Sequence, residues 1–339
     1  MQDSSTRGEF SVSRQEKINM KKIIRKAGYA ILTLVAIVFI AGLILAFLPT
    51  KLKTNHRGIS AERAALLRER YKGPHDQFTT TDGETLFLWR WNPDTLVETK
   101  KDIAVLIFHG ITAYGGAYTM AGVPISSGGY TTFGLDYRGH GLSGGNRGDA
   151  PGLERWITDL AESVKYIKGL GFSKVIVLGH SLGVASAICA VNIVPDEIAG
   201  VVLLSGAYEG RPGLSTPRTL FEKTKILASS VFRPSYQAVE YYRKGMTVTK
   251  DSLFNFRYTL RFVTMVDVKK LRLSETSNIP VLVGAGDQDE LFEVDKVKEL
   301  YDLVPGDKKE FLVMKNTTHA KIPVECWEQV VAWLDKTYL

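Results

Sequence analysis

The chain has 339 residues and a formal net charge of +7, from 43 Lys and Arg against 36 Asp and Glu. With 45% hydrophobic and 23% charged residues, it is neither a disordered nor a fibrous chain, and its length fits one or two globular domains. Two cysteines, Cys189 and Cys326, are too few for a disulfide framework, and no Cys/His cluster indicates a zinc site. We therefore expect no metal and no cofactor.

The positive charge is concentrated near the N-terminus. Residues 1–55 hold 9 Lys and Arg but only 3 Asp and Glu, so the remainder of the chain is almost neutral. A nucleic-acid partner is not indicated by such a distribution. Within this region a basic tail, 1–26, precedes a segment without charged residues, 27–48.

Residues 27–48 predict a transmembrane helix, because 22 apolar residues make roughly 33 Å of helix, enough to cross a bilayer core. The run is longer than the apolar part of a signal peptide, and no small-residue cleavage pair follows it. This favours an uncleaved anchor over its two alternatives, a cleaved signal peptide and a buried helix. The excess of Lys and Arg before the span predicts a single-pass topology, with the N-terminus cytoplasmic and the main domain on the extracytoplasmic side.

A linker, 49–74, follows the span and is predicted to hold a short amphipathic helix with Ser60 as its N-cap. From residue 75 two alternating strands flank an Asp82-Gly83 turn, and apolar strands then alternate with helical segments. The predicted strands span 103–110, 130–137, 174–179, 200–206, 279–286 and 309–314. The predicted helices span 151–169, 182–192, 292–304 and 323–337.

This alternation predicts an α/β fold with a mostly parallel sheet and helices on both faces, built from residues 75–207 and 278–339. Residues 208–277 interrupt the rhythm and are interpreted as a cap (lid) over the carboxyl edge of the sheet. The cap holds 13 Lys and Arg against 6 Asp and Glu. Two readings of this charge stay open: a solvated helical surface, or attraction of an anionic lipid or substrate.

Two GxSxG segments occur, and only one has the context that nucleophilic chemistry needs. Ser143 lies in a glycine-rich loop with no helix after it, which indicates a turn residue. Ser181 stands between a buried strand and a helix of small residues, in Gly179-His180-Ser181-Leu182-Gly183. A sharp strand-to-helix turn of this kind lifts the hydroxyl above the sheet edge, so Ser181 is the candidate nucleophile.

A serine nucleophile needs a base, and the base needs an acid that orients it. His319 is the histidine that follows Ser181 in the chain, as the base does in this architecture. Asp287, in a GxxD spacing with Gly284, is the predicted acid, and Asp289 is the alternative.

Other polar residues near these motifs are given structural roles. Glu290 and Glu293 are predicted to lie in the first turn of the next helix, where acidic residues suit the helix dipole. We interpret His109 and His140 as corner residues. A pocket role and a packing role both stay open for His180.

With these motifs and the segment 136–145 (DYRGHGLSGG), the chain resembles the α/β-hydrolases, and within them the group of monoacylglycerol lipases, lysophospholipases and serine aminopeptidase-like enzymes. The resemblance covers about residues 75–339. It implies an eight-stranded sheet, a helical cap between the sixth and seventh strands, and an oxyanion hole from the backbone N–H groups of Ile111 and Leu182. The soluble members of this group lack a transmembrane anchor.

These expectations describe a serine carboxylester hydrolase that works through an acyl-enzyme and acts on a monoacylglycerol- or lysophospholipid-like ester at a membrane surface. Two alternatives stay open: a serine peptidase or amidase, and a non-catalytic membrane-tethered binding protein. Acyl-chain length, oligomeric state and motion of the cap are not decided by the sequence.

Overall fold

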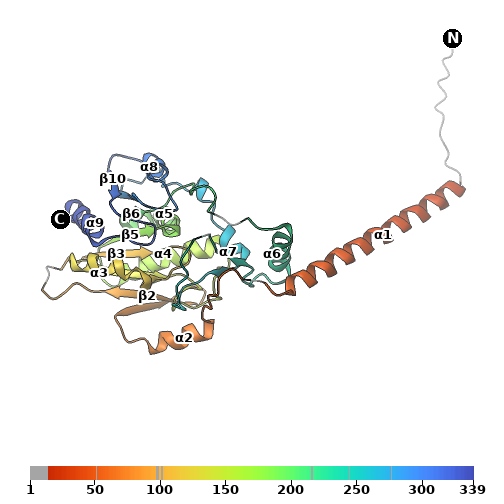
Figure 1. Cartoon of the computed structure of the whole chain (residues 1–339), viewed down its shortest axis with the longest axis horizontal. Helices are drawn as coiled ribbons and strands as arrows, with labels where there is room; N and C mark the ends of the chain where they lie inside the picture. The colour runs from red at the N-terminus through yellow and green to blue at the C-terminus, as the bar shows by residue number, and fades with distance from the viewer. Residues whose placement is uncertain are drawn as a thin grey trace, which may run out of the picture.

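The computed structural model describes residues 14–50, 52–96, 99–100, 102–214, 217–243, 245–275 and 277–339. A globular body holds the sheet, and the long helix α1 (Arg14–Phe47) projects away from it (Figure 1). Residues 1–13 of the predicted basic tail lie outside the described residues.

Among the described helices, α1 has the length and apolar composition needed to cross a membrane. Only 6% of its most apolar stretch is buried inside the protein. A core helix of a soluble domain is mostly buried. The alternative that residues 27–48 form a buried helix therefore does not fit the structure. After α1, Ser60 caps α2 (Ala61–Arg70) by accepting a hydrogen bond from the Arg63 N–H.

The main sheet has eight strands in the order β1-β2-β4-β3-β5-β6-β9-β10. Its strands are β1 (His75–Thr79), β2 (Thr85–Trp91), β3 (Ile103–Phe108), β4 (Thr131–Asp136), β5 (Lys174–His180), β6 (Ile198–Leu204), β9 (Val281–Gly286) and β10 (Lys309–Met314). The pairs β1–β2 and β2–β4 are antiparallel, and the remaining pairs are parallel. The predicted α/β-hydrolase fold with a mostly parallel eight-stranded sheet is confirmed.

Helices cover both faces of this sheet, as its buried strands require. One core cluster joins the sheet to α4 (Leu153–Gly169), α5 (Leu182–Ile193) and α8 (Val294–Asp302). The other joins it to α3 (Thr119–Ser127) and α9 (Val324–Tyr338). The helix α3 was not predicted from the sequence, because Gly122 and Pro124 disfavour a helix locally. A Cβ at Gly122 would lie 2.3 Å from the Trp91 ring, so the glycine lets this helix pack closely against β2.

The segment between β6 and β9, the sixth and seventh strands of the main sheet, forms the cap. It contains α6 (Leu220–Phe232), the short strand pair β7 (Val239–Glu240) and β8 (Arg257–Tyr258), and α7 (Leu260–Thr264). The side chains of Tyr258 and Phe262 join the core cluster on one face of the sheet, so the cap is packed onto the body.

The segment 136–145 forms a buried corner at the end of β4. The Asp136 carboxylate accepts hydrogen bonds from the backbone N–H groups of Gly115 and Leu142, both at 2.6 Å. Ser143 is buried, donates to the Asp136 carbonyl and accepts from the Phe87 N–H. Its hydroxyl is therefore used inside the fold, in agreement with the predicted turn role.

Candidate active site

Ser181 occupies the turn between β5 and α5 with φ 57° and ψ −119°, a conformation that is strained for a residue with a side chain. The glycines on either side permit it. A Cβ at Gly183 would lie 1.9 Å from the Phe108 carbonyl oxygen, and one at Gly179 would lie 2.1 Å from the Gly183 oxygen. The GxSxG spacing thus lets the strand and the helix approach closely while the serine hydroxyl stays accessible.

His319 lies in the loop between β10 and α9, and its Nε2 is 3.0 Å from the Ser181 Oγ. The histidine that chain order selected thus contacts the serine, although 138 positions separate them in the sequence. The ring is buried and lies against Phe292 and His180, with centroid distances of 5.6 and 4.9 Å.

Asp289, and not the predicted Asp287, lies beside His319. The Oδ2 atom of Asp289 is 3.0 Å from the His319 Nδ1, while its Oδ1 accepts hydrogen bonds from the N–H groups of Leu291 and Phe292. Burial alone would raise the pKa of Asp289, but these hydrogen bonds and the His319 ring hold the pKa below its ordinary value. The carboxylate is therefore ionised beside the imidazole.

The prediction of Asp287 as the acid is wrong because β9 ends at Gly286, as predicted, and the turn that follows points Asp287 away from His319 and Asp289 toward it. Asp287 is exposed, accepts a hydrogen bond from the Thr317 N–H and lies 3.8 Å from the Lys315 Nζ. The turn after the strand is closed by a hydrogen bond from the Asp289 N–H to the Gly286 carbonyl. Counted from Gly286 instead of Gly284, the GxxD spacing leads to Asp289.

Glu290 lies beside this site. It was predicted to lie in the first turn of the next helix, and this prediction is wrong. The helix α8 begins later, at Val294. One carboxylate oxygen of Glu290 accepts the His319 backbone N–H at 2.9 Å, and the other lies 3.2 Å from the guanidinium of Arg243 in the cap. An ion pair therefore connects the cap to the loop that holds Asp289, and this loop is in turn hydrogen-bonded to His319.

His180 faces the site from the residue before Ser181. Its Nδ1 lies 2.7 Å from the hydroxyl oxygen of Tyr118, and the same oxygen accepts the Gly110 N–H at 2.9 Å. Burial, and then the nearby His319, lower the pKa of His180 to about 3, so its ring stays neutral. Both roles left open by the sequence are present, because His180 packs inside the fold and also lines a cavity at the serine.

The two residues predicted to supply oxyanion donors flank the serine. Leu182 is the first residue of α5, where backbone N–H groups have no partner within the helix. Ile111 follows the His109-Gly110 corner, and a Cβ at Gly110 would lie 3.3 Å from the Ser181 Cβ. His109 and His140 are buried behind this corner, each bonded to a nearby backbone carbonyl, as corner residues.

Two cavities meet at Ser181. The first, about 240 Å³, is lined by the His319 loop, the Ile111 corner and cap residues that include Tyr241, Phe254 and Phe256. The second, about 290 Å³, is lined mainly by apolar residues, namely Leu182, Val184, Ala185, Ile188, Ala207, Tyr208, Val268, Leu271, Phe292 and Leu300. Within the described chain, no three His, Cys, Asp or Glu side chains gather where they could hold a metal ion.

A family model described as serine aminopeptidase, S33, matches residues 99–323. The chain belongs to this family. Among its relatives, the 2-(acetamidomethylene)succinate hydrolase of Mesorhizobium japonicum is 30% identical over 142 residues, which are 42% of this chain and 48% of that protein. The human monoglyceride lipase is 29% identical over 159 residues, 47% of this chain and 48% of that protein. The chain thus spans about half the length of these curated relatives.

A solved structure supports the S33 assignment at the level of fold. The monoacylglycerol lipase of Paleococcus ferrophilus gives a TM-score of 0.58 at 21% identity and covers 74% of this chain and 99% of its own. The resemblance inferred from the motifs, including the α/β-hydrolase group, is confirmed.

Proposed function

We propose that this S33-family chain is a serine carboxylester hydrolase that works through an acyl-enzyme. The observation that carries the proposal is the continuous hydrogen-bonded chain from Ser181 through His319 to Asp289, placed where two cavities meet. A hydroxyl, an imidazole and an ionised carboxylate in this order form a general arrangement for acyl transfer.

In the first half-reaction, the Ser181 Oγ attacks the ester carbonyl carbon and His319 Nε2 takes the hydroxyl proton. The backbone N–H groups of Ile111 and Leu182 bind the resulting oxyanion. The bond to the alcohol oxygen then breaks as His319 returns its proton to that oxygen. In the second half, water attacks the acyl-enzyme, His319 takes the proton from the water and gives it back to Ser181, and the carboxylic acid leaves.

The test is Ser181→Ala, with hydrolysis of p-nitrophenyl esters and covalent labelling by a fluorophosphonate as the two measurements. We expect kcat to fall by about 10⁶-fold and labelling to disappear. Labelling that persists in this variant would falsify the assignment of the nucleophile. Ser143→Ala is the matched control for fold and labelling site, because Ser143 is the buried serine of the second GxSxG segment.

The cavities favour an ester with an apolar acyl group, of the monoacylglycerol or lysophospholipid kind. The second cavity is mainly aliphatic and aromatic, and the first adds Met120, Met246 and Phe254. A panel of p-nitrophenyl esters of increasing length, a monoacylglycerol, a lysophospholipid and aminoacyl amides separates the substrate classes. Faster turnover of the amides than of every ester would move the assignment to the peptidase alternative.

An aminopeptidase needs an acidic group that binds the substrate amine. Within the described residues neither cavity is lined by Asp or Glu. The carboxylate of Glu290, beside the triad, already pairs with Arg243 and accepts the His319 N–H. This arrangement favours an ester over a free amino terminus.

The proposal includes membrane anchoring through residues 27–48, with the N-terminus cytoplasmic and the catalytic domain on the opposite side. The exposed apolar surface of α1 supports it. Retention of the full chain in membranes after carbonate extraction tests the anchor. Release into the supernatant would overturn it.

A further inference from the structure

The cap helix α6 packs against the C-terminal part of α1 (Figure 1). The Phe232 ring meets the Phe39 ring edge-on at 5.1 Å, and a Cβ at Gly42 would lie 2.9 Å from the Phe232 ring. Ala46 is fully buried in this contact. Small residues on α1 thus let the two helices approach closely, as they do between membrane helices.

Two contacts place α6 beside the last turns of α1. At the domain end, the Lys225 Nζ donates to the Pro49 carbonyl at 2.6 Å and to the Thr50 hydroxyl at 2.8 Å. At the other end, Phe232 meets α1 at Phe39, which precedes Leu48 by nine residues, or roughly 13 Å along a helix. If α1 spans the bilayer with residues 27–48, the C-terminal half of α6 must lie at the depth of the apolar layer.

The outward face of that half is apolar. Leu227 and Val231, four residues apart and so on one face of the helix, are 60% and 66% exposed. The inward face carries Ala228 and Ser229, which are buried. A helix on a soluble surface has the reverse arrangement, with polar side chains outside and apolar ones inside.

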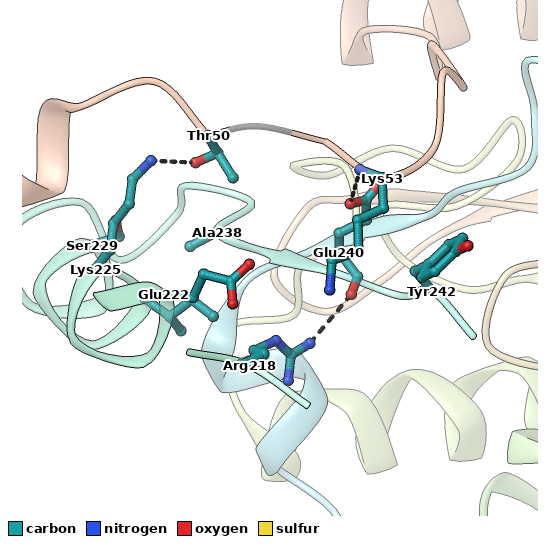
Figure 2. Close-up of a pocket in the computed structure, with 10 residues that line it drawn as sticks. Thr50, Lys53, Arg218, Glu222, Lys225, Ser229, Ala238, Glu240 and Tyr242 are labelled. Carbon is teal, nitrogen blue, oxygen red and sulfur yellow. Dashed lines mark hydrogen bonds between the residues drawn. The ribbon is translucent and has the colours of Figure 1, made fainter. Parts of the chain in front are cut away.

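Charged residues gather at the domain end of the contact, where the headgroup layer would lie. Figure 2 shows Lys225 pointing toward Thr50, and Arg218 pointing toward the backbone oxygen of Glu240. The Glu240 carboxylate accepts the backbone N–H groups of Lys53 and Thr54, both at 2.7 Å. The linker after α1 is therefore bound to the cap and does not act as a free tether.

The Arg233 guanidinium, one residue after α6, is held at the last residues of α1 and does not face lipid. It donates to the Ala46 carbonyl at 3.2 Å and lies over the Phe47 and Tyr236 rings at 4.8 and 3.8 Å. A long cationic side chain whose charge is hydrogen-bonded to a carbonyl and stacked on aromatic rings can lie near the boundary of an apolar layer.

We propose that α6 enters the apolar layer of the membrane beside α1, with Leu227 and Val231 facing the lipid chains, so that anchor and cap form one membrane-bound unit. This proposal rests on the membrane anchoring proposed above. It names a hydrocarbon surface, and not lipid phosphate, as the main partner of the cap.

The experiment uses the full chain in phosphatidylcholine vesicles, with single cysteines labelled by an environment-sensitive fluorophore. The test position is Leu227→Cys. Ile37→Cys, in the middle of α1, reports on the anchor, and Leu303→Cys is the matched control, since Leu303 is a half-exposed leucine of the hydrolase body. The native Cys189 and Cys326 are buried and are shielded from the label in the folded protein.

Lipids that carry a nitroxide on the acyl chain quench only a probe inside the apolar layer. We expect the probes at 227 and 37 to shift to shorter wavelength and lose fluorescence by about twofold or more, and the probe at 303 to stay unchanged. Quenching at 37 without quenching at 227 overturns the docking of α6 and leaves the anchor intact. Absence of quenching at both positions overturns the anchor and the docking together, while hydrolysis of a soluble short ester by the same samples reports separately on Ser181.

Discussion

The hydrogen bonds around His319 determine which of its nitrogens can accept a proton. Asp289 is ionised, so its Oδ2 can only accept, and the His319 Nδ1 must donate to it. In the neutral ring Nε2 is then the acceptor, and it lies 3.0 Å from the Ser181 hydroxyl. Asp289 therefore selects the tautomer that lets His319 act as a base toward Ser181.

At this scale we predict that Asp289→Asn lowers kcat for a short ester by about 10⁴-fold, because the amide can present an N–H to the ring and favour the wrong tautomer. Asp287→Asn is the matched variant two residues away, and we expect it to keep kcat within about twofold, because Asp287 is exposed and turned toward Thr317. Thermal unfolding of both proteins checks the fold. A larger loss from Asp287→Asn than from Asp289→Asn contradicts the arrangement.

The residues around Ser181 show what a sequence can predict at this scale. GHSLG and chain order select Ser181 and His319, because the turn between a strand and a helix is a local feature with few solutions. The acid is harder, since Gly284 and Gly286 give the same spacing to Asp287 and Asp289. The end of the strand at Gly286 was predicted, so the choice depends on the turn after it, which the Asp289 N–H closes onto the Gly286 carbonyl while Asp287 accepts the Thr317 N–H. Thr317 and His319 lie about 30 residues later, so their contacts with this turn are not visible in a local pattern.

At the scale of elements, Arg138 holds three parts of the body together. Its guanidinium binds the Asp159 carboxylate of α4 with two hydrogen bonds, at 2.8 and 2.9 Å, and reaches Asp82 in the β1–β2 turn at 2.7 Å. Arg138 and Asp159 are buried. The motif 136–145 that carried the family resemblance is therefore a structural corner beside the active site.

We predict that Arg138→Met lowers the free energy of unfolding by about 3 kcal/mol at pH 7, because Asp159 loses a buried partner and is left with Arg155 among the described residues. Arg138→Lys should recover part of this loss, as one ammonium cannot replace a two-bond contact. Denaturant unfolding of the full chain in detergent measures both variants. An unchanged midpoint for Arg138→Met would show that the corner is held by other contacts.

The same network predicts how stability depends on pH. Burial pushes the pKa of Asp82 up, but the hydrogen bonds from Arg138 and Thr80 and the nearby guanidinium charges outweigh this and lower the pKa to about 2. A carboxylate with a lowered pKa stabilises the fold above its unfolded value, near 4, and this contribution is lost as the pH falls toward 2. The difference between wild type and Arg138→Met should therefore shrink between pH 4 and pH 2. A difference that stays constant over this range would contradict the assignment.

For the molecule as a whole, part of the positive charge of the cap is neutralised by ion pairs with the hydrolase body. Among the described residues, three cap arginines form ion pairs across this boundary, Arg211 with Glu293, Arg243 with Glu290 and Arg261 with Asp149. A fourth pair joins Glu209 of the cap to Lys296 of the body. The sequence predicted the excess of cations in the cap but not their partners, because partners on distant elements meet only after folding. These ion pairs belong to neither of the two readings of the cap's charge, a solvated helical surface or attraction of an anionic lipid or substrate.

The exposed cap lysines outside these pairs provide the last prediction. Charge reversal of Lys223 and Lys250 together should lower activity on anionic vesicles, because it removes attraction to the lipid surface, and should leave hydrolysis of a soluble short ester unchanged. Reversal of the exposed lysines Lys72 and Lys165, outside the cap, is the control with the same change in net charge.

On neutral vesicles both proteins should act like the wild type, since α6 would contact the hydrocarbon layer through Leu227 and Val231. The loss on anionic vesicles should also fade at high salt, where surface charges are screened. Equal losses for the cap and control variants would show that net charge alone, and not the position of the cap at the membrane, governs the effect.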